Sequence, residues 1–576
     1  METSEKLITE NLDVWTSVVK VKSSAGRGAS KNRELYGIQK LRALVLELAV
    51  MGKLVEQDPE DETVRATLKS DLFGSDSEAD APFEIPPVWR WSKLDQLASI
   101  NGGFAFKSSD YSDEGTRVVR ISDFDEHGFK DAKIVRHSFS PELEKFSLRD
   151  GDILMAMTGG TVGKSFHTRA LTEPMLVNQR VATIRASEAI ASNYLNILIQ
   201  SELTKKVIHE AKNSTNDNIS MRDIKSFLVP LPPLAEQHRI VAKVDELMAL
   251  CDQLEQEQES SIAAHDTLVA TLLNALTETT AFAEAWERIQ ANFDTLFTTE
   301  SSIDQLKQTI LQLAVMGKLV PQDPKDEPVE ELLSRLERYK RENPIEESRK
   351  SRGDQTSSNA NPNFDIPDSW AWTTLSGIAL RINDGNYGES YPKKSELLTS
   401  GIPFLTSASI LPDGSIDRAN LKHISPEKQA ELTKAQIVAG DVIFPNRGAR
   451  GGQLKGSEPI AVVVPQWLKE GNVNPQVTRI RLHPDFYASS FLCTALRTPL
   501  FLSQFGAATG GTALPFINLT KTKAFAVPVP PLAEQHRIVA KVDELMTLCD
   551  ALKASLATAQ ATQLNLADSL VEQAVT

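Results

Sequence analysis

The chain has 576 residues, a length that corresponds to two to four domains. Its 41% hydrophobic and 24% charged residues are ordinary for a globular protein, and no apolar run is long enough for a membrane-spanning helix. The mixed, charged N-terminus is unlike a signal peptide and three cysteines cannot form a disulfide framework, so we expect a cytoplasmic protein.

The net charge of −15 is spread unevenly along the chain. Residues 82–233 contain 19 basic and 19 acidic side chains, and residues 363–531 contain 16 and 13. The acidity therefore belongs to the remaining segments. Because phosphate binding needs only a local basic face, the overall charge does not exclude nucleic acid as a ligand of these two segments.

Residues 1–81 form the first predicted segment, an N-terminal helical region. Apolar residues recur at helical spacing from Ile38 to Leu48, and Gly52 follows as a typical helix stop. The sequence therefore predicts a helix with one apolar face that ends near Gly52.

Residues 82–233 predict a mixed α/β domain. The runs Arg117–Ile121, Asp152–Met157 and Val181–Arg185 are typical of strands, and Tyr194–Glu210 favours a helix.

A glycine-rich loop, Thr158–Ser165, follows the second of these predicted strands. It is similar to a nucleotide P-loop, but Thr158 stands where the first glycine is required, which argues against ATP. Gly160 and Gly163 still allow the backbone to approach a phosphate, and Lys164 supplies charge. An ordinary surface loop is the alternative interpretation.

Residues 234–323 predict a central helical spacer. Pro232-Pro233 followed by Leu-Ala-Glu-Gln is a typical helix start, and the apolar residues that follow have the spacing of a helix that packs on another helix. A shorter helix runs from Ile303 to Leu313 and ends at Gly317. Residues 324–362 are a linker that we expect to be partly disordered, because Ser348–Asn361 is rich in Ser, Asn, Arg and Gly.

Residues 363–531 predict a second mixed α/β domain, and residues 532–576 a C-terminal helical spacer. Strand-like runs are Ile402–Thr406, Asp441–Phe444 and Ala461–Val464. The fold class is therefore α+β, with two α/β domains separated by long antiparallel coiled-coil helices.

The chain is an internal duplication with a pseudo-two-fold relation between its halves. Pro232–Met248 recurs unchanged at Pro530–Met546, and Leu48–Val55 recurs at Leu313–Val320. The two α/β domains share only a skeleton of matching residues. This contrast favours helices that face equivalent partners and domains that face different targets, although drift after duplication is the simpler alternative.

Several polar and glycine-rich positions in the domains are candidates for contacts with DNA. Arg, Asn and Gln read base edges, and glycine and basic residues approach phosphates. The candidates are Arg120, Gly160, Gly163, Lys164, Arg180, Asn216, Arg447, Arg450, Gly451, Gly452 and Thr512. For Arg120 and for Arg180, a structural salt bridge or cap is an equally good interpretation.

Two other patterns favour no chemistry in this chain. Asn361-Pro362-Asn363-Phe364 imitates an adenine-methyltransferase motif, but it lies in a polar linker and no glycine-rich cofactor motif precedes it. His238 and His536 have no nucleophile or metal-ligand partner nearby in the sequence. We therefore expect no catalytic residue and no metal site.

The Pro-Leu-Pro-Pro-Leu-Ala-Glu-Gln-His-Arg-Ile-Val run, its C-terminal copy and the Trp-containing starts of both domains strongly resemble the specificity subunit of type I restriction–modification enzymes. The resemblance extends from about Ile38 onward, and the long N-terminal segment looks like the type IB branch. It implies that the first domain reads one half of an asymmetric, bipartite DNA site and that the second domain reads the other half.

The resemblance also implies partners that carry the chemistry. Two modification subunits would methylate adenine with S-adenosylmethionine, and restriction subunits would use ATP and Mg²⁺. Leu234–Leu247 and Leu532–Leu545 would contact the modification subunits. The residues expected in that contact are Leu234, Glu236, Gln237, Arg239, Leu532, Glu534, Gln535 and Arg537. A coiled-coil adaptor without DNA binding and a self-contained methyltransferase or nuclease are the alternatives.

Overall fold

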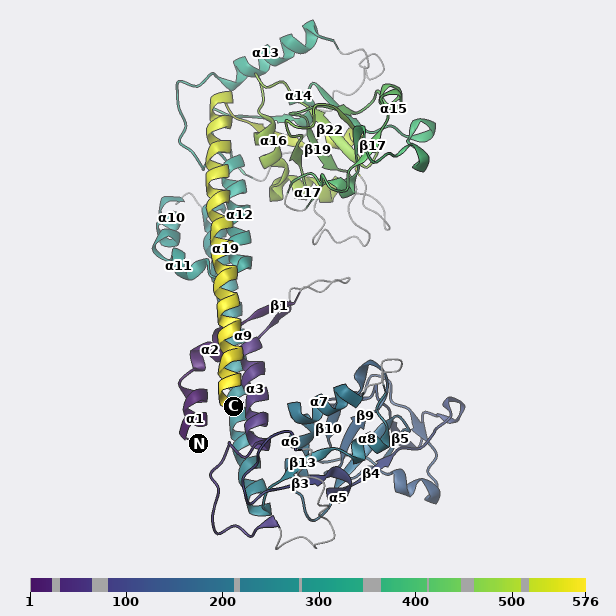
Figure 1. Cartoon of the computed structure of the whole chain (residues 1–576). Coiled ribbons are helices and arrows are strands. Elements are labelled where there is room, and N and C mark those ends of the chain that lie inside the picture. The colour runs from purple at the N-terminus through teal and green to yellow at the C-terminus, as the bar shows by residue number, and fades with distance from the viewer. Residues whose placement is uncertain are drawn as a thin grey trace. The chain divides into compact units, whose positions relative to one another are not determined.

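The computed structural model describes residues 2–22, 32–64, 81–211, 218–278, 282–344, 364–411, 414–446, 460–508 and 517–575 (Figure 1). The chain forms two compact units: unit 1 comprises residues 1–262 and 559–576, and unit 2 comprises residues 263–558. Each contains one α/β domain and part of the long helices. No described helix is both long and apolar enough to cross a membrane.

The first α/β domain, in unit 1, is built on two small sheets. The central sheet is antiparallel in the order β10–β9–β12–β4, and the second sheet has the order β11–β5–β8, with β11 parallel to β5. The central strand β9 is buried at all four residues, which accounts for its uninterrupted apolar sequence. The strands are β4 (Ala98–Gly102), β5 (Thr116–Val119), β8 (Arg136–His137), β9 (Ile153–Ala156), β10 (Ser165–His167), β11 (Met175–Val177) and β12 (Val181–Ala186).

One helix predicted in this domain is two helices. The structure ends α6 (Ser192–Gln200) at Ser201 and begins α7 (Glu202–Ala211) directly after it. The hydroxyls of Ser201 and Thr204 both donate hydrogen bonds to the Leu198 carbonyl, at 2.7 and 2.6 Å. Side-chain hydroxyls that compete for backbone carbonyls in this way favour a break, and helical periodicity alone does not reveal it.

The second α/β domain, in unit 2, repeats this sheet order. Its central antiparallel sheet is β15–β22–β19–β20, and its second sheet is β17–β16–β21–β18, with β16 parallel to β21. The strands are β15 (Arg381–Asp384), β16 (Ile402–Leu405), β17 (Lys422–Ile424), β18 (Gln436–Ile437), β19 (Val442–Pro445), β20 (Val462–Val463), β21 (Gly471–Val473) and β22 (Val477–Arg481). The duplication thus preserves topology where it does not preserve sequence.

A pair of strands closes each domain beside the start of a long helix. In unit 1, β3 (Arg90–Lys93) pairs with β13 (Leu228–Leu231), and α9 (Leu234–Glu278) follows. In unit 2, β14 (Ala371–Thr374) pairs with β23 (Ala526–Val529), and α19 (Leu532–Val575) follows. The Trp-containing start of each domain is thereby brought to the helix that leaves it.

Three helices pack together in unit 1: α3 (Tyr36–Val50), the first part of α9 and the end of α19. Arg42 of α3 pairs with Asp252 and Glu255 of α9 at 2.6 and 2.7 Å, and Lys40 pairs with Asp568 of α19 at 2.8 Å. The short helix therefore contacts the long helix of its own half as well as that of the other half.

The contacts further along α3 give the helix directions. Tyr36 at its start binds Asp568, and Lys53 beyond its end donates to the Val575 carbonyl at 2.8 Å. Residue numbers increase in the same direction along the two helices, so α3 and α19 are parallel. Because Arg42 lies near Asp252 while Gln57 lies near Glu236, α3 and α9 are antiparallel. The two long helices are therefore antiparallel to each other, as predicted.

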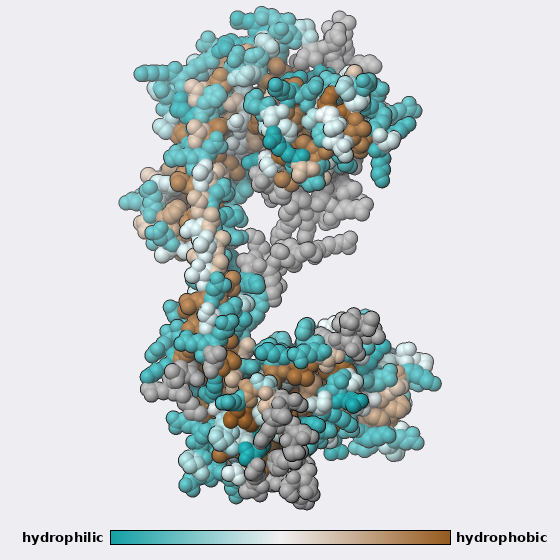
Figure 2. Space-filling model, viewed as in Figure 1, coloured by the Kyte–Doolittle hydropathy of each residue, from teal (hydrophilic) through white to brown (hydrophobic). Residues whose placement is uncertain are grey.

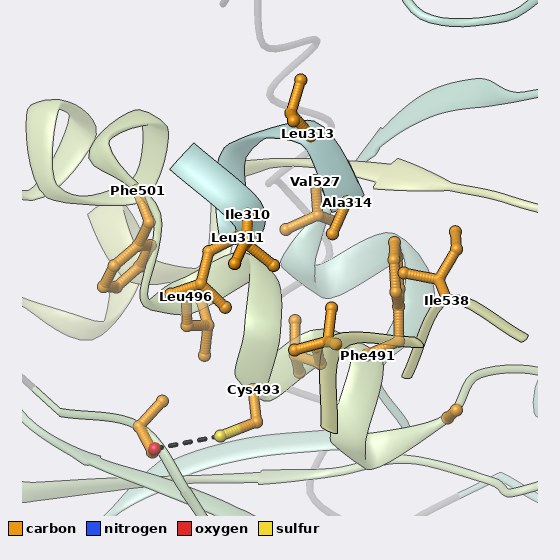
Figure 3. Packing of buried hydrophobic residues seen from close by; sticks show 14 of the residues in the cluster. Ile310, Leu311, Leu313, Ala314, Phe491, Cys493, Leu496, Phe501, Val527 and Ile538 are labelled. Atoms are coloured by element: carbon orange, nitrogen blue, oxygen red, sulfur yellow. Dashed lines mark hydrogen bonds between the residues drawn. The ribbon is translucent and has the colours of Figure 1, made fainter. Parts of the chain in front are cut away.

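Unit 2 has an equivalent core around α12 (Glu300–Val315), α16 (Ser489–Leu496) and the first part of α19. Figure 3 shows Ile310 and Leu311 of α12 beside Leu496 of α16, with Ile538 of α19 in the same cluster. Here the Cys493 thiol donates a hydrogen bond to the Ala461 carbonyl at 3.0 Å. Like Cys251 and Cys549, Cys493 is buried and forms no disulfide bond.

The glycines predicted to end the short helices do so. Gly52 follows α3 with a φ of 71°, and Gly317 follows α12 with a φ of 69°, a conformation that glycine adopts without strain. A Cβ on Gly52 would lie 2.5 Å from Pro86, and one on Gly317 would lie 2.4 Å from Pro367. Each glycine therefore ends a helix and also makes room for the start of its α/β domain.

Candidate nucleic-acid interface

In the first domain, three segments distant in sequence meet at one end of the central sheet. The Met157 amide donates to the Arg180 carbonyl at 3.0 Å, and the Ile219 amide donates to the Met157 carbonyl at 2.9 Å. Thr158 also forms an isolated β-bridge with Asn218. The glycine-rich loop, the Asn178–Arg180 turn and the residues Asn218 and Ile219 are thus adjacent.

Arg180 is the exposed cation at this end of the sheet. The side chain of Asn178 is buried and shapes the turn, because its Oδ1 accepts from the Arg180 amide at 3.3 Å and its Nδ2 donates to the Tyr111 hydroxyl at 3.3 Å. Gly103 packs against the same turn: a Cβ there would lie 2.1 Å from the Val177 carbonyl oxygen. The backbone is fixed on the inside while Arg180 is presented to solvent.

The three predicted residues of the glycine-rich loop lie in different parts of it: Gly160 at the tip, and Gly163 and Lys164 at the base. Gly160 is exposed in the turn η4 (Gly159–Thr161), where an added Cβ would meet nothing within 4 Å. Gly163 has a φ of 86° and lies against Ile208 of α7. Lys164 points inward, donates to the Ile121 carbonyl at 3.3 Å and lies 5.0 Å from the Phe124 ring centroid. Burial lowers the pKa of Lys164.

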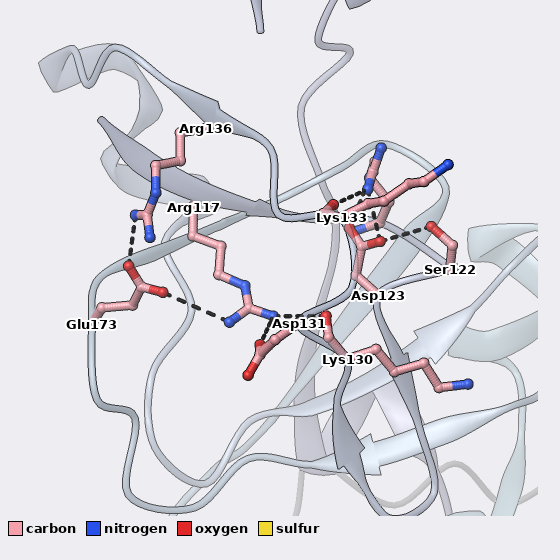
Figure 4. A network of polar contacts seen from close by, with 9 residues as sticks. Arg117, Ser122, Asp123, Lys130, Asp131, Lys133, Arg136 and Glu173 are labelled. Carbon is pink, nitrogen blue, oxygen red and sulfur yellow. Dashed lines mark hydrogen bonds and ion pairs between the residues drawn. The ribbon is translucent and has the colours of Figure 1, made fainter. Parts of the chain in front are cut away.

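Arg120 follows β5 and pairs with Asp123, which belongs to the network of polar contacts shown in Figure 4. Its guanidinium donates to the Asp123 carboxylate at 2.7 and 2.9 Å and to the Lys133 carbonyl at 2.7 Å. The hydrogen bond that Arg120 donates to the Asp123 carboxylate raises the pKa of Arg120. The neighbouring Arg117 is held by Asp131 at 2.9 Å. Arg120 therefore positions a loop, and a contact with a base would require its pair with Asp123 to open.

Three basic or titratable side chains that the sequence reasoning missed lie beside the glycine-rich loop. Lys205, Lys206 and His209 are exposed on α7. Lys205 and His209 share a shallow depression with Gly163, and the surface over α7 is hydrophilic (Figure 2). The Lys-Lys pair near the end of an amphipathic helix was the available signal. Lys205 pairs with Glu202 at 2.8 Å, and these side chains add basic groups beside the glycine-rich loop.

The second domain has the same arrangement at the corresponding end. The Ile517 amide donates to the Asn446 carbonyl at 3.1 Å, as Ile219 does to Met157. Gly385 matches Gly103, since its Cβ would lie 2.1 Å from the Val473 carbonyl oxygen. The remaining candidates, Asn216, Arg447, Arg450, Gly451, Gly452 and Thr512, lie outside the described residues.

The side chains that the second domain presents at this end differ from those of the first. Tyr387 is exposed, and its hydroxyl donates to the Pro475 carbonyl at 3.2 Å. The Lys434 amine lies 5.2 Å from the centroid of the Tyr387 ring. The helix α17 (Pro499–Ala508) follows α16 as α7 follows α6, but its sequence contains no charged residue. The two domains thus share a backbone frame and carry different chemistry on it.

The expected partner-binding residues at the start of α9 are bound largely within the chain. Glu236 is fully buried and accepts hydrogen bonds from Trp89 Nε1 at 2.9 Å and from Gln57 Nε2 at 2.5 Å. Burial raises the pKa of Glu236, against the lowering effect of these two donors. Arg239 pairs with Asp61 at 2.6 Å. These residues join the first domain and its preceding segment to α9.

The same joint recurs in unit 2 with equivalent residues. Glu534 accepts from Trp370 Nε1 at 3.0 Å and from Gln322 Nε2 at 2.6 Å, and Arg537 pairs with Asp326 at 2.6 Å. Burial likewise raises the pKa of Glu534. We name these two sets of residues the Trp–Glu joints: Trp89, Gln57, Glu236, Asp61 and Arg239 in unit 1, and Trp370, Gln322, Glu534, Asp326 and Arg537 in unit 2.

The glutamines that follow are buried as well. Gln237 accepts from the Ala191 amide at 2.8 Å, and Gln535 accepts from the Ala488 amide at 2.8 Å. Leu234 is 41% exposed, and Leu532 is half-buried.

Both copied helices also present an identical exposed face. Its residues are Ala235, His238, Ala242, Asp245 and Glu246 of α9 and Ala533, His536, Ala540, Asp543 and Glu544 of α19. Across the described part of the chain, no three His, Cys, Asp or Glu side chains are grouped to hold a metal ion.

Known proteins resemble this chain along its whole length. The model of the type I restriction modification DNA specificity domain matches residues 86–264 and again residues 370–559. The specificity subunit of the type I restriction enzyme EcoAI from Escherichia coli is 33% identical over 621 residues, with 99% of each protein covered. That of EcoEI, also from Escherichia coli, is 32% identical over 610 residues with the same coverage.

A solved structure described as the structural basis underlying complex assembly and conformational transition of the type I R-M system has a similar fold. It covers 86% of this chain and 99% of its own, with 19% identity and a TM-score of 0.51. With a domain match in each half and end-to-end similarity to the two subunits from Escherichia coli, the chain belongs to the family of type I restriction–modification specificity subunits and is the non-catalytic DNA specificity subunit of such a system.

Proposed function

We propose that the two domains read the two halves of an asymmetric, bipartite DNA site. The observation that carries this proposal is that the two domains share a sheet order and backbone contacts but have different side chains at one end of their central sheets, which we call the loop-bearing ends. Arg180, the glycine-rich loop and the α7 lysines belong to the first domain, whereas Tyr387 and Lys434 stand at the corresponding end of the second. Unlike surfaces on equivalent supports suit unlike half-sites.

The long helices set the spacing between the half-sites in this proposal. The 45 residues of α9 correspond to a length of about 67 Å at 1.5 Å per residue. One turn of duplex DNA spans about 34 Å. A helix of this length is therefore sufficient to hold two domains one or more turns apart.

The identical exposed faces of α9 and α19 each bind one modification subunit. Because the Trp–Glu joints bury Glu236, Gln237, Glu534 and Gln535, the exposed residues on the same turns are the better candidates for direct contact. His238 and His536 lie on these faces, and Leu234 and Leu532 precede them by four residues on the same helices. Two copies of one surface fit two copies of one partner.

The partner subunits supply the chemistry. Modification subunits use S-adenosylmethionine to methylate adenine, and restriction subunits with ATP and Mg²⁺ complete a complex that acts in the cytoplasm. The long N-terminal segment supports placement in the type IB branch. The chain itself contributes DNA recognition and the positions of its partners.

Mapping of methylated adenines in the host genome tests this function. The expected motif has two specified halves separated by a gap of constant length and unspecified sequence. Duplexes with either half altered should lose binding to the complex of the chain with its modification subunits. A contiguous motif, or a complex that binds equally well after one half is altered, would contradict the proposal.

A further inference from the structure

The turn that carries Arg180 recurs in the second domain with Gln476 in its place. The Met157 amide donates to the Arg180 carbonyl at 3.0 Å, and the Asn446 amide donates to the Gln476 carbonyl at 2.9 Å. In each domain the donor directly follows the central strand, β9 or β19, and the acceptor directly precedes its neighbour, β12 or β22. Gln476 is therefore the structural counterpart of Arg180.

A buried asparagine holds the inner side of both turns. In the first domain, Asn178 Oδ1 accepts a hydrogen bond from the Arg180 amide at 3.3 Å. In the second domain, Asn474 Oδ1 accepts one from the Gln476 amide at 3.1 Å. Both asparagine side chains are buried. The side chains of Arg180 and Gln476 thus start from backbone that the same hydrogen bonds hold in both domains.

A partly exposed aromatic ring lies beside each turn. Phe104 is 38% exposed, its amide donates to the Val177 carbonyl at 2.8 Å, and its ring packs on that of Phe106 with centroids 5.0 Å apart. Tyr387 is 48% exposed, and its hydrogen bond to the Pro475 carbonyl holds it beside the second turn. Aromatic rings make apolar contacts with bases, including the thymine methyl group, so the surroundings of both turns suit a DNA groove.

The exchange of Arg for Gln at this position matches the reading of bases. Arginine forms paired hydrogen bonds with O6 and N7 of guanine, and glutamine forms them with N6 and N7 of adenine. Phosphates are the same at every sequence, so a phosphate contact gives no reason for a cation in one domain and a neutral amide in the other. A constant turn with a changed side chain is what two readers of different bases require.

The side chains of both residues are placed for such contacts. Arg180 is exposed, whereas the guanidinium of Arg120 is held by Asp123. Gln476 is half-buried, and its Oε1 accepts a hydrogen bond from the Ser407 hydroxyl at 3.4 Å. Because an amide oxygen accepts two hydrogen bonds, this contact orients the Gln476 amide and leaves the oxygen able to accept from adenine N6.

We propose that Arg180 and Gln476 are equivalent specificity-determining residues, which read a guanine in the first half-site and an adenine in the second. This inference rests on the proposed function, because it assigns one residue of each domain to one base of its half-site. An exchange of residues at this position of either domain then exchanges the preferred base at one base pair of the corresponding half.

Reciprocal exchanges test the assignment. Arg180→Gln should change the preference at one base pair of the first half-site from guanine to adenine, and Gln476→Arg should cause the reverse change in the second. Binding of the complex with its modification subunits is measured on duplexes that carry the mapped methylation motif with each specified base pair replaced in turn. The affinity ratio between the two bases should change by about 5- to 150-fold, as expected for one pair of hydrogen bonds.

Two further pairs of variants separate base reading from general effects. Arg180→Ala and Gln476→Ala should relax the preference at the same base pairs without creating a new one. The matched controls, Arg149→Gln and Gln466→Arg, make the same changes at exposed positions next to the opposite ends of β9 and β19. They should leave every base preference unchanged.

Three results would overturn the inference. One is an unchanged base preference in either exchange, and another is a change in the half-site of the other domain. The third is an equal loss of affinity on every duplex with a salt slope shallower by about 1 for Arg180→Gln, which would identify a phosphate contact. An unaltered complex that binds equally well after either half-site is altered would instead contradict the proposed function.

Discussion

The two Trp–Glu joints and the two loop-bearing ends changed differently after the duplication. The hydrogen bond from Trp to Glu is 2.9 Å in unit 1 and 3.0 Å in unit 2, and the Arg–Asp pair is 2.6 Å in both. At the loop-bearing ends, the backbone contacts persist while the side chains differ. Selection for a constant joint and variable ends accounts for this contrast, because a domain that is held in the same way can present different residues to DNA.

Removal of a donor from a Trp–Glu joint should have the largest effect on stability. Trp89→Phe removes a hydrogen bond to a fully buried carboxylate, which should lower the free energy of unfolding by about 1.5 to 3 kcal/mol. Trp370→Phe should cause a matching loss in unit 2. Denaturant unfolding, monitored separately in each unit by amide hydrogen exchange, measures the loss in free energy of unfolding for both variants. A loss in one unit without a comparable loss in the other would show that the joints are not equivalent.

Lys205 and Lys206 on α7 test the difference between the loop-bearing ends of the two domains. Replacement of both by Gln should make the salt dependence of DNA binding shallower by about 2, since two phosphate contacts would be lost. The corresponding helix α17 has no charge to remove, so the first domain should account for this part of the slope. Arg338→Gln with Arg341→Gln, which removes two exposed cations of α13 (Val329–Glu342) in unit 2, controls for general charge. A slope equal to that of wild type would remove α7 from the interface.

The pH response of the joints should be the smallest effect. Because burial raises the folded-state pKa of Glu236, its contribution to stability is complete below the unfolded pKa of about 4.3 and is lost as the pH rises through the folded-state pKa. Glu534 should respond in the same direction.

The variants Glu236→Gln and Glu534→Gln should each abolish this pH dependence locally. They should cost less than about 1 kcal/mol at neutral pH, because the facing Gln57 or Gln322 amide can turn over to accept a hydrogen bond. Denaturant unfolding monitored in each unit, repeated from acid to neutral pH, measures this pH dependence of the free energy of unfolding. A pH dependence that persists in both variants would assign it to other groups.

Much of the frame could be predicted from local sequence. Periodicity and terminal glycines gave α3, α12 and the long helices, and apolar runs gave β5, β9 and β19. The break at Ser201 could not be predicted in this way, because hydroxyl contacts with a carbonyl three residues away override the helical pattern.

The candidate site was harder to predict than the frame. Glu236 belongs to a charged helix start and is typical of an exposed position, yet Trp89, far earlier in the chain, buries it. Arg120 has the side chain of a base reader, but Asp123 three residues later holds it. Arg180 differs only in lacking such a neighbour in the sequence. The local pair of Arg120 with Asp123 could therefore have been anticipated from their spacing, whereas the burial of Glu236 depends on a tertiary contact with Trp89 that spacing does not encode.

The most direct test of independent reading by the two domains is to transplant residues 82–233 from a relative into this chain and map methylated adenines. The account predicts that one half of the methylated sequence changes while the other half and the gap remain, because the Trp–Glu joints and helices are retained. A change in both halves, or in neither, would contradict it.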